Sequence, residues 1–447
     1  MADFLSIFGA RGALACDAPR AHRANPHCTT SNKGPRMSDS ALDAAGSSLP
    51  LSPTSKPAAK LAAPRAQSDA RADSAGKEHV IDAMRGFAAL LVAYFHCRQI
   101  EWVGMQAFHQ NAGHSFSLNT IAAYLTFPIA WGSAGVPIFF VISGYCIHRS
   151  AALRLAANPA YRLGAANFWV RRFARIYPVL LAALLLTFAL DWFSLQLPPV
   201  SHKIREIGLE AFLVNLFSLQ GVAGKTYGSN GALWTLSLEV QFYAIYPLLF
   251  ALRRRIGMTS VLAIVGVVNV VSAYALERHD IQFFTSYWFS WTLGAWIADA
   301  KAHSVLQTRS SRWLYALAAA CIALGCAAFH FGQYGAFQLW AIGFAFYLYK
   351  ALEPNDRNKG NGSGRAGWGL RLLSRFGDFS FSLYLIHLPI FVLLSSLLFR
   401  SSLQMSIWPS FGYMLVAVPA AYVFYRLVEL PAMKWSASFK PKTKSAL

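Results

Sequence analysis

The sequence predicts an all-α polytopic membrane protein with about ten transmembrane helices and both termini in the cytoplasm. Of its 447 residues, 55% are hydrophobic and only 13% are charged, which is too little charge to cover a water-soluble chain of this length. Apolar segments long enough to cross about 30 Å of hydrocarbon recur after residue 80. The net charge of +20 lies in short basic segments between these runs, as in cytoplasmic loops, so nucleic acid is not an expected partner.

The expected spans follow one another with short connections. They are 82–100, 120–147, 173–194, 231–252, 258–276, 283–299, 312–331, 334–350, 378–399 and 409–427. An even number of spans puts all of the basic segments on one side of the membrane, in agreement with the positive-inside rule. These segments are 149–175, 253–255, 300–312, 351–375 and 434–447.

Three segments are expected outside the spans. Residues 1–78 hold seven of the twenty prolines and are predicted to be a disordered cytoplasmic tail, because they have too little apolar surface to offset the entropy of ordering. The transmembrane domain then covers 79–432, and 433–447 form a basic cytoplasmic tail. The apolar segment 205–222 contains two glutamates and an asparagine, so we expect an interfacial or re-entrant helix on the periplasmic side.

The sequence contains none of the common cofactor or metal motifs. The six cysteines are scattered and match neither a metal-ligand spacing nor a disulfide framework, so we expect no metal site and no bound cofactor. No Walker-type glycine loop, HExxH or GxSxG motif is present, and the histidine-x4-aspartate motif of glycerolipid acyltransferases is also absent.

The first span contains an arginine and a histidine, Arg85 and His96, eleven residues apart. At about 100° and 1.5 Å per residue, this spacing puts both side chains near one helix face, roughly 16 Å apart along the axis. Ionisable residues inside a bilayer are costly, and they usually mark a substrate or proton path. The alternative is that Arg85 anchors the helix at the cytoplasmic surface and His96 only packs against its neighbours.

Two further clusters have unusual polar content. Ser143 and Gly144 interrupt an aromatic-rich span, and small residues there allow either close helix contact or the approach of a ligand. Arg172 and Arg175 lie three residues apart on one face at the cytoplasmic start of a helix, where they could hold a phosphate. The alternative for this pair is simple positive-inside anchoring.

A polar and aromatic stripe follows the span that begins near residue 231. It consists of Thr235, Glu239, Phe242, Tyr243 and Tyr246 at helical spacing. Glu239 would lie about two turns deep, so it needs either a functional role or a structural ion pair.

Near the C-terminus, His387 precedes Pro389 and could form a second polar wall of a cavity, or be a capped structural histidine. Arg426 and Glu429 are expected to form an i, i+3 pair at the interface.

These clusters, in this order, resemble the acyltransferase-3 family of membrane acyltransferases, which modify bacterial surface and extracellular glycans. The resemblance covers about residues 79–432. It rests on Asp82 with Arg85 and His96 (Arg-x10-His), FFVISG at 139–144, RFAR at 172–175, WTLSLEVQFY at 234–243, SLYLIHLP at 382–389 and ELP at 429–431.

The resemblance implies an essential histidine at His96, a cytoplasmic acyl-CoA donor with acetyl as the commonest group, and a multi-pass protein of the bacterial inner membrane. Some members carry a fused periplasmic SGNH-type esterase domain. Since this chain stops at Leu447 without one, it is expected either to complete transfer to a carbohydrate acceptor alone or to hand the acyl group to a periplasmic partner enzyme.

The residues themselves suggest a mechanism consistent with this family. Burial favours the neutral form of an imidazole, so His96 could take a proton from an attacking sugar hydroxyl as general base. Glu239 would orient the imidazole, steady its charged form or hold the acceptor, and Arg85 would guide the pantetheine or polarise the thioester carbonyl. The expected substrate-binding residues are Arg172, Arg175, Ser143, Tyr243, His387 and Asp82.

A different class of function, a proton-coupled exporter of a glycan or metabolite, would also use an internal carboxylate and histidine. Transporters of many folds contain inverted repeats, and no convincing repeat relates the two halves of this chain. Acceptor identity, acyl length and oligomeric state are not readable from the sequence.

Overall fold

The computed structural model describes residues 62–112, 114–276, 279–303, 312–353 and 367–439. The chain divides into two units, Met1–Ser68 and Asp69–Leu447. Most of the expected N-terminal tail and the last eight residues of the basic C-terminal tail therefore lie outside the described residues. The first helix, α2, already begins at Ala62, within the segment that we expected to be a tail.

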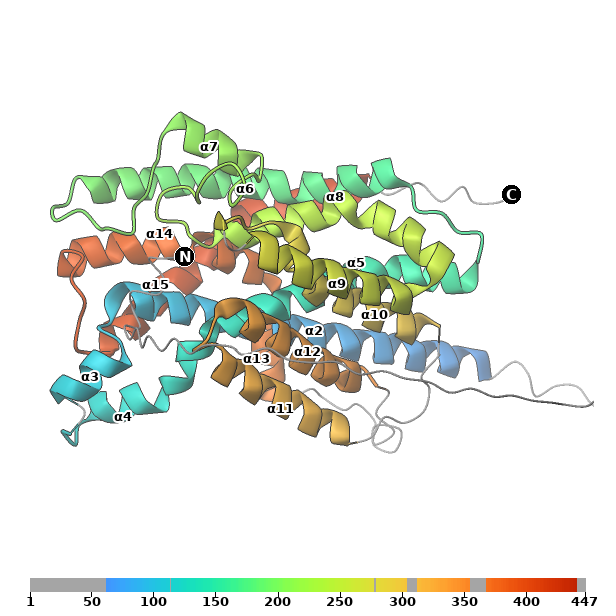
Figure 1. The fold of residues 1–447 in the computed structure, drawn as a ribbon, viewed down its shortest axis with the longest axis horizontal. Helices are drawn as coiled ribbons and strands as arrows, with labels where there is room; N and C mark the ends of the chain where they lie inside the picture. Colours follow the sequence, from blue (N-terminus) through green and yellow to red (C-terminus); the bar gives the residue numbers. More distant parts are fainter. Residues whose placement is uncertain (1–61, 113, 277–278, 304–311, 354–366, 440–447) are drawn as a thin grey trace, which may run out of the picture. The chain divides into compact units, whose positions relative to one another are not determined.

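The described residues form helices and no strand, which confirms an all-α polytopic fold. The helices of the first half are α2 (Ala62–Glu101), α3 (Met105–Ala112), α4 (Leu118–Leu125), α5 (Gly135–Ala157), α6 (Ala165–Leu195), α7 (Leu209–Leu216) and α8 (Leu233–Ile256). Those of the second half are α9 (Met258–Leu276), α10 (Trp288–Ala302), α11 (Trp313–Ala328), α12 (Gln333–Ala351), α13 (Trp368–Asp378), α14 (Ser380–Phe399), α15 (Trp408–Phe424) and α16 (Leu430–Ser438). Figure 1 shows that most of the long helices run along one common direction.

Nine of the ten expected spans each correspond to one helix, whereas the expected span 120–147 is divided among α4, a 3-10 helical segment (Phe127–Ala134) and α5. Seven helical segments among the described residues are long and apolar enough to cross a membrane. The other three expected spans correspond to α10, α11 and α12, of 15, 16 and 19 residues. A multi-pass membrane protein is therefore established, whereas the count of ten and the side of each terminus stay predictions.

The segment 205–222 contains a single short helix. Helix α7 has 8 residues, so it is only about 12 Å long and cannot cross about 30 Å of hydrocarbon. Leu209, Leu213 and Phe217 are exposed along one side of it, as expected for a helix at the membrane interface.

Helices α5 and α10 approach each other more closely than side chains would allow. A Cβ added at Gly144 of α5 would lie 1.9 Å from the carbonyl oxygen of Trp291, and one at Gly294 of α10 would lie 1.8 Å from that of Val141. Only glycine permits this backbone contact. Of the two expectations for the Ser143–Gly144 pair, Gly144 therefore provides the close helix contact.

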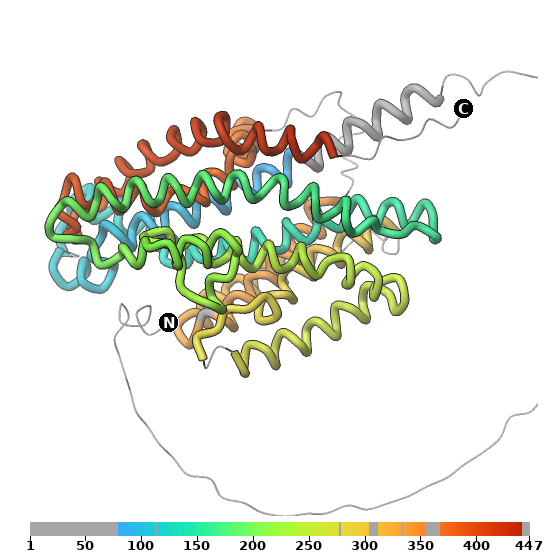
Figure 2. Tube along the Cα trace, turned by 90° about the horizontal axis from the view of Figure 1, so that it is seen from above, coloured from blue at the N-terminus to red at the C-terminus, as the bar shows by residue number. Residues whose placement is uncertain are grey.

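Segments far apart in the sequence also pack together. In Figure 2, α6 (green) runs beside the C-terminal helices (red), in agreement with the packing of α6 against α14 and α16. Proline interrupts the hydrogen bonding of α14 at Pro389 and of α8 at Pro247. Helices α2, α5, α6, α8 and α14 together surround the site described next.

Candidate functional site

A cavity of about 140 Å³ lies between α2, α5, α6, α8 and α14. An apolar cavity of similar size in another protein holds a benzene molecule, so this one can enclose the end of a substrate but not a whole coenzyme. Its apolar walls include Phe139, Phe140 and Leu236. Its polar and charged lining residues include Arg85, Ser143, Arg172, Arg175, Thr235, Glu239, Tyr243, Ser380 and Tyr384.

Three guanidinium groups from two helices line this cavity. Arg85 comes from α2, where its Nη1 atom lies 3.8 Å from Oδ1 of Asp82. Arg172 and Arg175 come from the early turns of α6. The Arg172 guanidinium lies over the rings of Phe168 and Tyr243, at 5.6 and 5.8 Å from the ring centres. Such contacts orient a guanidinium without neutralising it. The cavity is therefore suited to an anionic ligand.

Glu239 is fixed on the wall formed by α5 and α8. Its Oε1 atom accepts hydrogen bonds from the Ser143 hydroxyl at 3.1 Å and from the Tyr243 hydroxyl, one turn along α8. Trp291 of α10 donates from Nε1 to Ser143 Oγ at 3.3 Å. Ser143 therefore connects the backbone contact of α5 and α10 to the carboxylate in the cavity.

The expected stripe on α8 divides between the cavity and the core. Thr235, Glu239 and Tyr243 line the cavity, whereas Phe242 and Tyr246 are buried and pack against aromatic rings, including that of Trp291. The stripe is wider than the cavity, so helical spacing alone could not separate these two sets.

His96 forms a pair with His387. The Nδ1 atom of His96 lies 2.9 Å from Nε2 of His387, and the two rings are nearly parallel at 7°. Nδ1 of His387 lies 2.9 Å from the carbonyl oxygen of Leu383, which can only accept, so His387 is protonated at Nδ1. In a neutral pair, His387 Nε2 is then an acceptor and His96 donates from Nδ1. This network assigns an unprotonated Nε2 to His96, as a general base requires.

The histidine pair is separate from the residues that line the cavity. Neither imidazole lines the cavity. Tyr384 does line it, and the centre of its ring lies 6.0 Å from the centre of the His387 ring. The Tyr384 hydroxyl is 2.6 Å from Thr235 Oγ1. The structure thus brings Arg85, Ser143, Arg172, Arg175, Glu239 and Tyr243 together, and it places His387 rather than Glu239 against the His96 imidazole. Sequence reasoning did not single out Tyr384.

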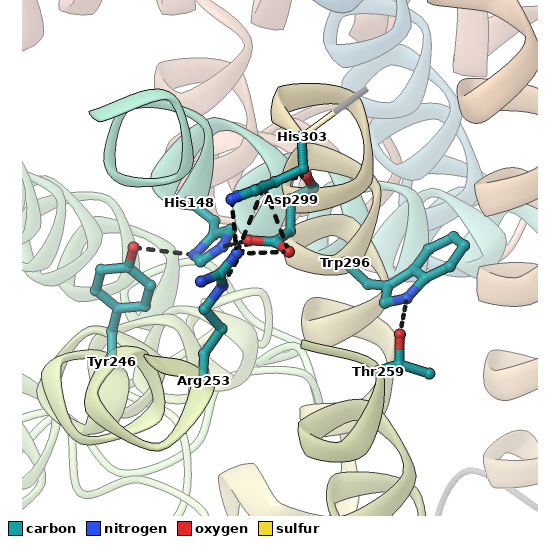
Figure 3. Close-up of polar contacts among 7 residues, drawn as sticks. All are labelled: His148, Tyr246, Arg253, Thr259, Trp296, Asp299 and His303. Carbon is teal, nitrogen blue, oxygen red and sulfur yellow. Dashed lines mark hydrogen bonds and ion pairs between the residues drawn. The ribbon is translucent and has the colours of Figure 1, made fainter. Parts of the chain in front are cut away.

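A second polar cluster supports the α8 wall. His148 of α5 is buried; its Nδ1 lies 3.1 Å from the Tyr246 hydroxyl and its Nε2 lies 3.2 Å from Asp299 Oδ1 of α10 (Figure 3). Arg253 of α8 makes a bidentate pair with Asp299, at 2.7 and 3.0 Å. The charge pattern of the sequence predicted that Arg253 lies in a cytoplasmic loop, whereas in the structure its ion pair with Asp299 joins α8 to α10.

The expected pair of Arg426 and Glu429 does not form, so that prediction was wrong. Residues Tyr425–Glu429 form a π-helical turn, η5, which changes the i, i+3 geometry. Glu429 is buried and accepts a hydrogen bond from the Ser382 hydroxyl at 2.6 Å. Arg426 is exposed and donates to the Tyr422 hydroxyl at 3.3 Å.

Comparison with known proteins gives consistent matches. A family model described as an acyltransferase domain matches residues 78–426. A proposed membrane-bound transacylase of Komagataeibacter xylinus is 30% identical over 300 residues, which cover 62% of this chain and 72% of that protein. An acyltransferase of Streptomyces mycarofaciens is 30% identical over 173 residues, or 39% of each chain. A peptidoglycan O-acetyltransferase of Listeria monocytogenes is 30% identical over 139 residues, which are 28% of this chain and 21% of that protein.

No solved structure matches the chain. The family model, in contrast, covers most of the sequence, including every residue that lines the cavity and both histidines of the pair. The protein therefore belongs to the acyltransferase-3 family and is an O-acyltransferase of the membrane.

Proposed function

We propose that the protein moves an acyl group, acetyl above all, from cytoplasmic acyl-CoA to a hydroxyl of a cell-surface or extracellular glycan, in the bacterial inner membrane. The observation that supports this most is the pairing of His96 with His387, which leaves His96 Nε2 unprotonated. Tyr384, whose ring contacts that of His387, lines the cavity that contains the three arginines. The name of the Listeria relative, an O-acetyltransferase, supports acetyl as the group.

Acyl-CoA would enter the cavity from the side that is lined by the arginines. Arg172 and Arg175 would bind the phosphates of acyl-CoA, because guanidinium groups form paired, charge-assisted hydrogen bonds with phosphate oxygens. Arg85 would face the pantetheine arm or the thioester. A cavity of about 140 Å³ has room for the thioester end, so most of the coenzyme would stay at the cytoplasmic mouth.

The transfer step needs one base. His96 Nε2 would take the proton of the acceptor hydroxyl while its oxygen attacks the thioester carbonyl carbon. The carbon–sulfur bond then breaks, and the leaving thiolate takes the proton back from His96. The products are an O-acyl ester and free CoA, and no proton is gained or lost overall.

His387 and Glu239 would have different tasks. His387 Nε2 accepts a hydrogen bond from the Nδ1–H of His96 and so keeps the base in the required tautomer. Glu239 holds Ser143 and Tyr243 at the cavity wall, where its carboxylate would bind a hydroxyl of the acceptor or balance the charge of the arginines.

Membrane vesicles that contain the full chain test this proposal. With radiolabelled acetyl-CoA outside inverted vesicles, we expect label to appear in glycan, and mass spectrometry should find one added acyl group on surface glycans of expressing cells. The His96→Ala variant should give neither signal. Unmodified glycan together with altered glycan export would contradict acyl transfer and favour an exporter.

A further inference from the structure

Helix α14 lacks a backbone hydrogen bond directly beside His387. In an α-helix, the N–H of residue 389 donates to the carbonyl of residue 385, but Pro389 has no N–H. The carbonyl of Leu385 therefore loses its helical partner, although Leu385 is fully buried. A buried carbonyl needs another donor, because leaving it unpaired costs free energy.

Asn230 supplies that donor from outside the helix. Its Nδ2 atom donates to the Leu385 carbonyl oxygen at 2.8 Å and to Thr187 Oγ1 at 3.0 Å. The Thr187 hydroxyl donates its own proton to the Ala183 carbonyl, so it can only accept from Asn230. Both neighbours are acceptors, which fixes the orientation of the Asn230 amide.

The turn that holds Asn230 is anchored to α6. The Asp191 carboxylate of α6 accepts hydrogen bonds from the backbone N–H of Ser229 at 2.7 Å and from its hydroxyl at 2.6 Å. Gly228 has a φ of +51°, and a Cβ there would lie 2.0 Å from Asp191 Oδ2. Asn230 is therefore a donor whose turn is fixed by hydrogen bonds to α6.

We propose that Asn230 is a positioning residue for the His96–His387 pair. The ring of His387 is held by the carbonyl of Leu383, in the same helical turn as Leu385. Asn230 fixes the backbone of this turn and thereby the point at which His387 Nε2 accepts from His96. The catalytic part of this inference rests on the proposed role of His96 as base, whereas the geometric part does not.

The first test compares Asn230→Ala with Asn215→Ala in the full-length protein. Asn215 is the control: it is fully buried, its Nδ2 donates to the backbone carbonyls of Ala211 and Lys225, and its Oδ1 accepts from the N–H of Tyr227. It therefore holds the segment that leads to Asn230 but makes no hydrogen bond to α14. We expect Asn230→Ala to lower kcat for radiolabelled acetyl-CoA by about tenfold or more, with KM changed less than about twofold, because small displacements of reacting groups are costly. Asn215→Ala should leave kcat near its original value.

A spectroscopic measurement separates this inference from the proposed activity. In protein with 15N-labelled histidine, the His96–His387 hydrogen bond gives characteristic nitrogen signals, which are assigned by their loss in His387→Gln. We expect Asn230→Ala to mix the two tautomers of His96, whereas Asn215→Ala should not. If no acyl transfer is detected in any sample but this change occurs, the positioning role stands and the proposed function fails.

Pro389→Ala provides a second variant. Alanine restores the N–H that reaches the Leu385 carbonyl within the helix. We therefore expect Asn230→Ala to have much less effect on the histidine signals, and on kcat, when residue 389 is alanine. Equal effects of Asn230→Ala in both backgrounds, or unchanged histidine signals in the single variant, would overturn the proposal. This comparison of single and double variants remains informative if one single variant folds poorly, because the double variant regains a donor to the Leu385 carbonyl, the N–H of residue 389.

Discussion

The unprotonated Nε2 of His96 is the atom on which the proposed chemistry depends. His96→Ala removes it, so we expect acyl transfer to fall by about a hundredfold or more, as is typical for loss of a general base. Transfer should also decline as the pH is lowered in the unchanged protein, because protonation uses the same lone pair. Radiolabel transfer from acetyl-CoA at several pH values measures both effects.

The control for this prediction is the amount of folded protein in the membrane. His96 is partly exposed and its ring bonds only to His387 among the described residues, so the alanine variant should insert and be produced normally. Transfer at the original rate by a well-produced His96→Ala variant would remove this residue from the mechanism.

His387 offers a second prediction at the same scale. His387→Ala removes the acceptor for His96 Nδ1, and the required tautomer is then no longer enforced. We expect about a tenfold or larger loss of kcat, with a smaller loss in His387→Gln, whose side-chain oxygen can accept the same proton. Equal kcat values for the alanine variant and the unchanged protein would show that His387 serves packing only.

The sequence identified most of these residues but not how they are paired. The spacing of Arg85 and His96 on one helix was readable, because it depends only on helical geometry. The partner of His96 was not, since the contact with His387 joins residues 291 positions apart. For Glu429, the expected i, i+3 pair failed because a π-helical turn replaces the regular helix.

Among the helices, the contact between α5 and α10 depends on two glycines. Gly144→Ala would place a Cβ against the backbone of Trp291, so the helices must separate. We expect a loss of stability of about 1–3 kcal/mol, in the range of overpacked cores. Thermal unfolding of the purified protein in detergent measures this loss.

Gly412→Ala is the matched control. Gly412 lies inside helix α15, and no atom lies within 4 Å of an added Cβ. Alanine has the higher helix propensity, so this variant should be as stable as the unchanged protein or more stable by up to about 1 kcal/mol. A Gly144→Ala variant that unfolds at the same temperature as Gly412→Ala would contradict the observed helix contact.

Apolar segment length located most of the long helices but not the short helices α3, α13 and α16. The expected spans 258–276 and 378–399 agree within two residues with α9 and α14, because apolar composition and helix length are local properties. The neighbour of each helix could not be predicted in this way. The position of α10 against α5 follows from complementary glycines on distant segments.

At the level of the whole molecule, the arginines should determine donor binding. We expect the double variant Arg172→Ala/Arg175→Ala to raise the apparent KM for acetyl-CoA by about tenfold or more, because each lost charge-assisted contact weakens binding. Arg426→Ala removes an exposed arginine that does not line the cavity, and it should change KM little.

An acyl donor without phosphate groups tests whether the arginines act through phosphate binding. An acetyl thioester of N-acetylcysteamine has no phosphate groups, so its use should be insensitive to loss of the two arginines. A fall in transfer from both donors would indicate that the arginines maintain the fold, and an unchanged KM for acetyl-CoA would leave them as topology anchors.

Membrane topology is the second property of the whole molecule that can be measured. Ten spans place the C-terminus on the cytoplasmic side, whereas the seven helical segments that satisfy length and apolarity alone would put the two termini on opposite sides. Alkaline phosphatase is active only in the periplasm. We expect it to be inactive when fused after Leu447 and active when inserted near Val200. Activity at both sites is the pattern expected from the seven segments alone and would contradict ten spans, and the reverse of the expected pattern would contradict a cytoplasmic C-terminus.

The direct backbone contact between α5 and α10 limits how the protein can open. With Gly144 and Gly294 in contact and Arg253 paired to Asp299, α5, α8 and α10 move as one rigid wall. Any widening of the cavity must then come from α2, α6 or α14 on the other side. Such widening would move the helices that carry the histidines and the arginines and would leave α5, α8 and α10 in place.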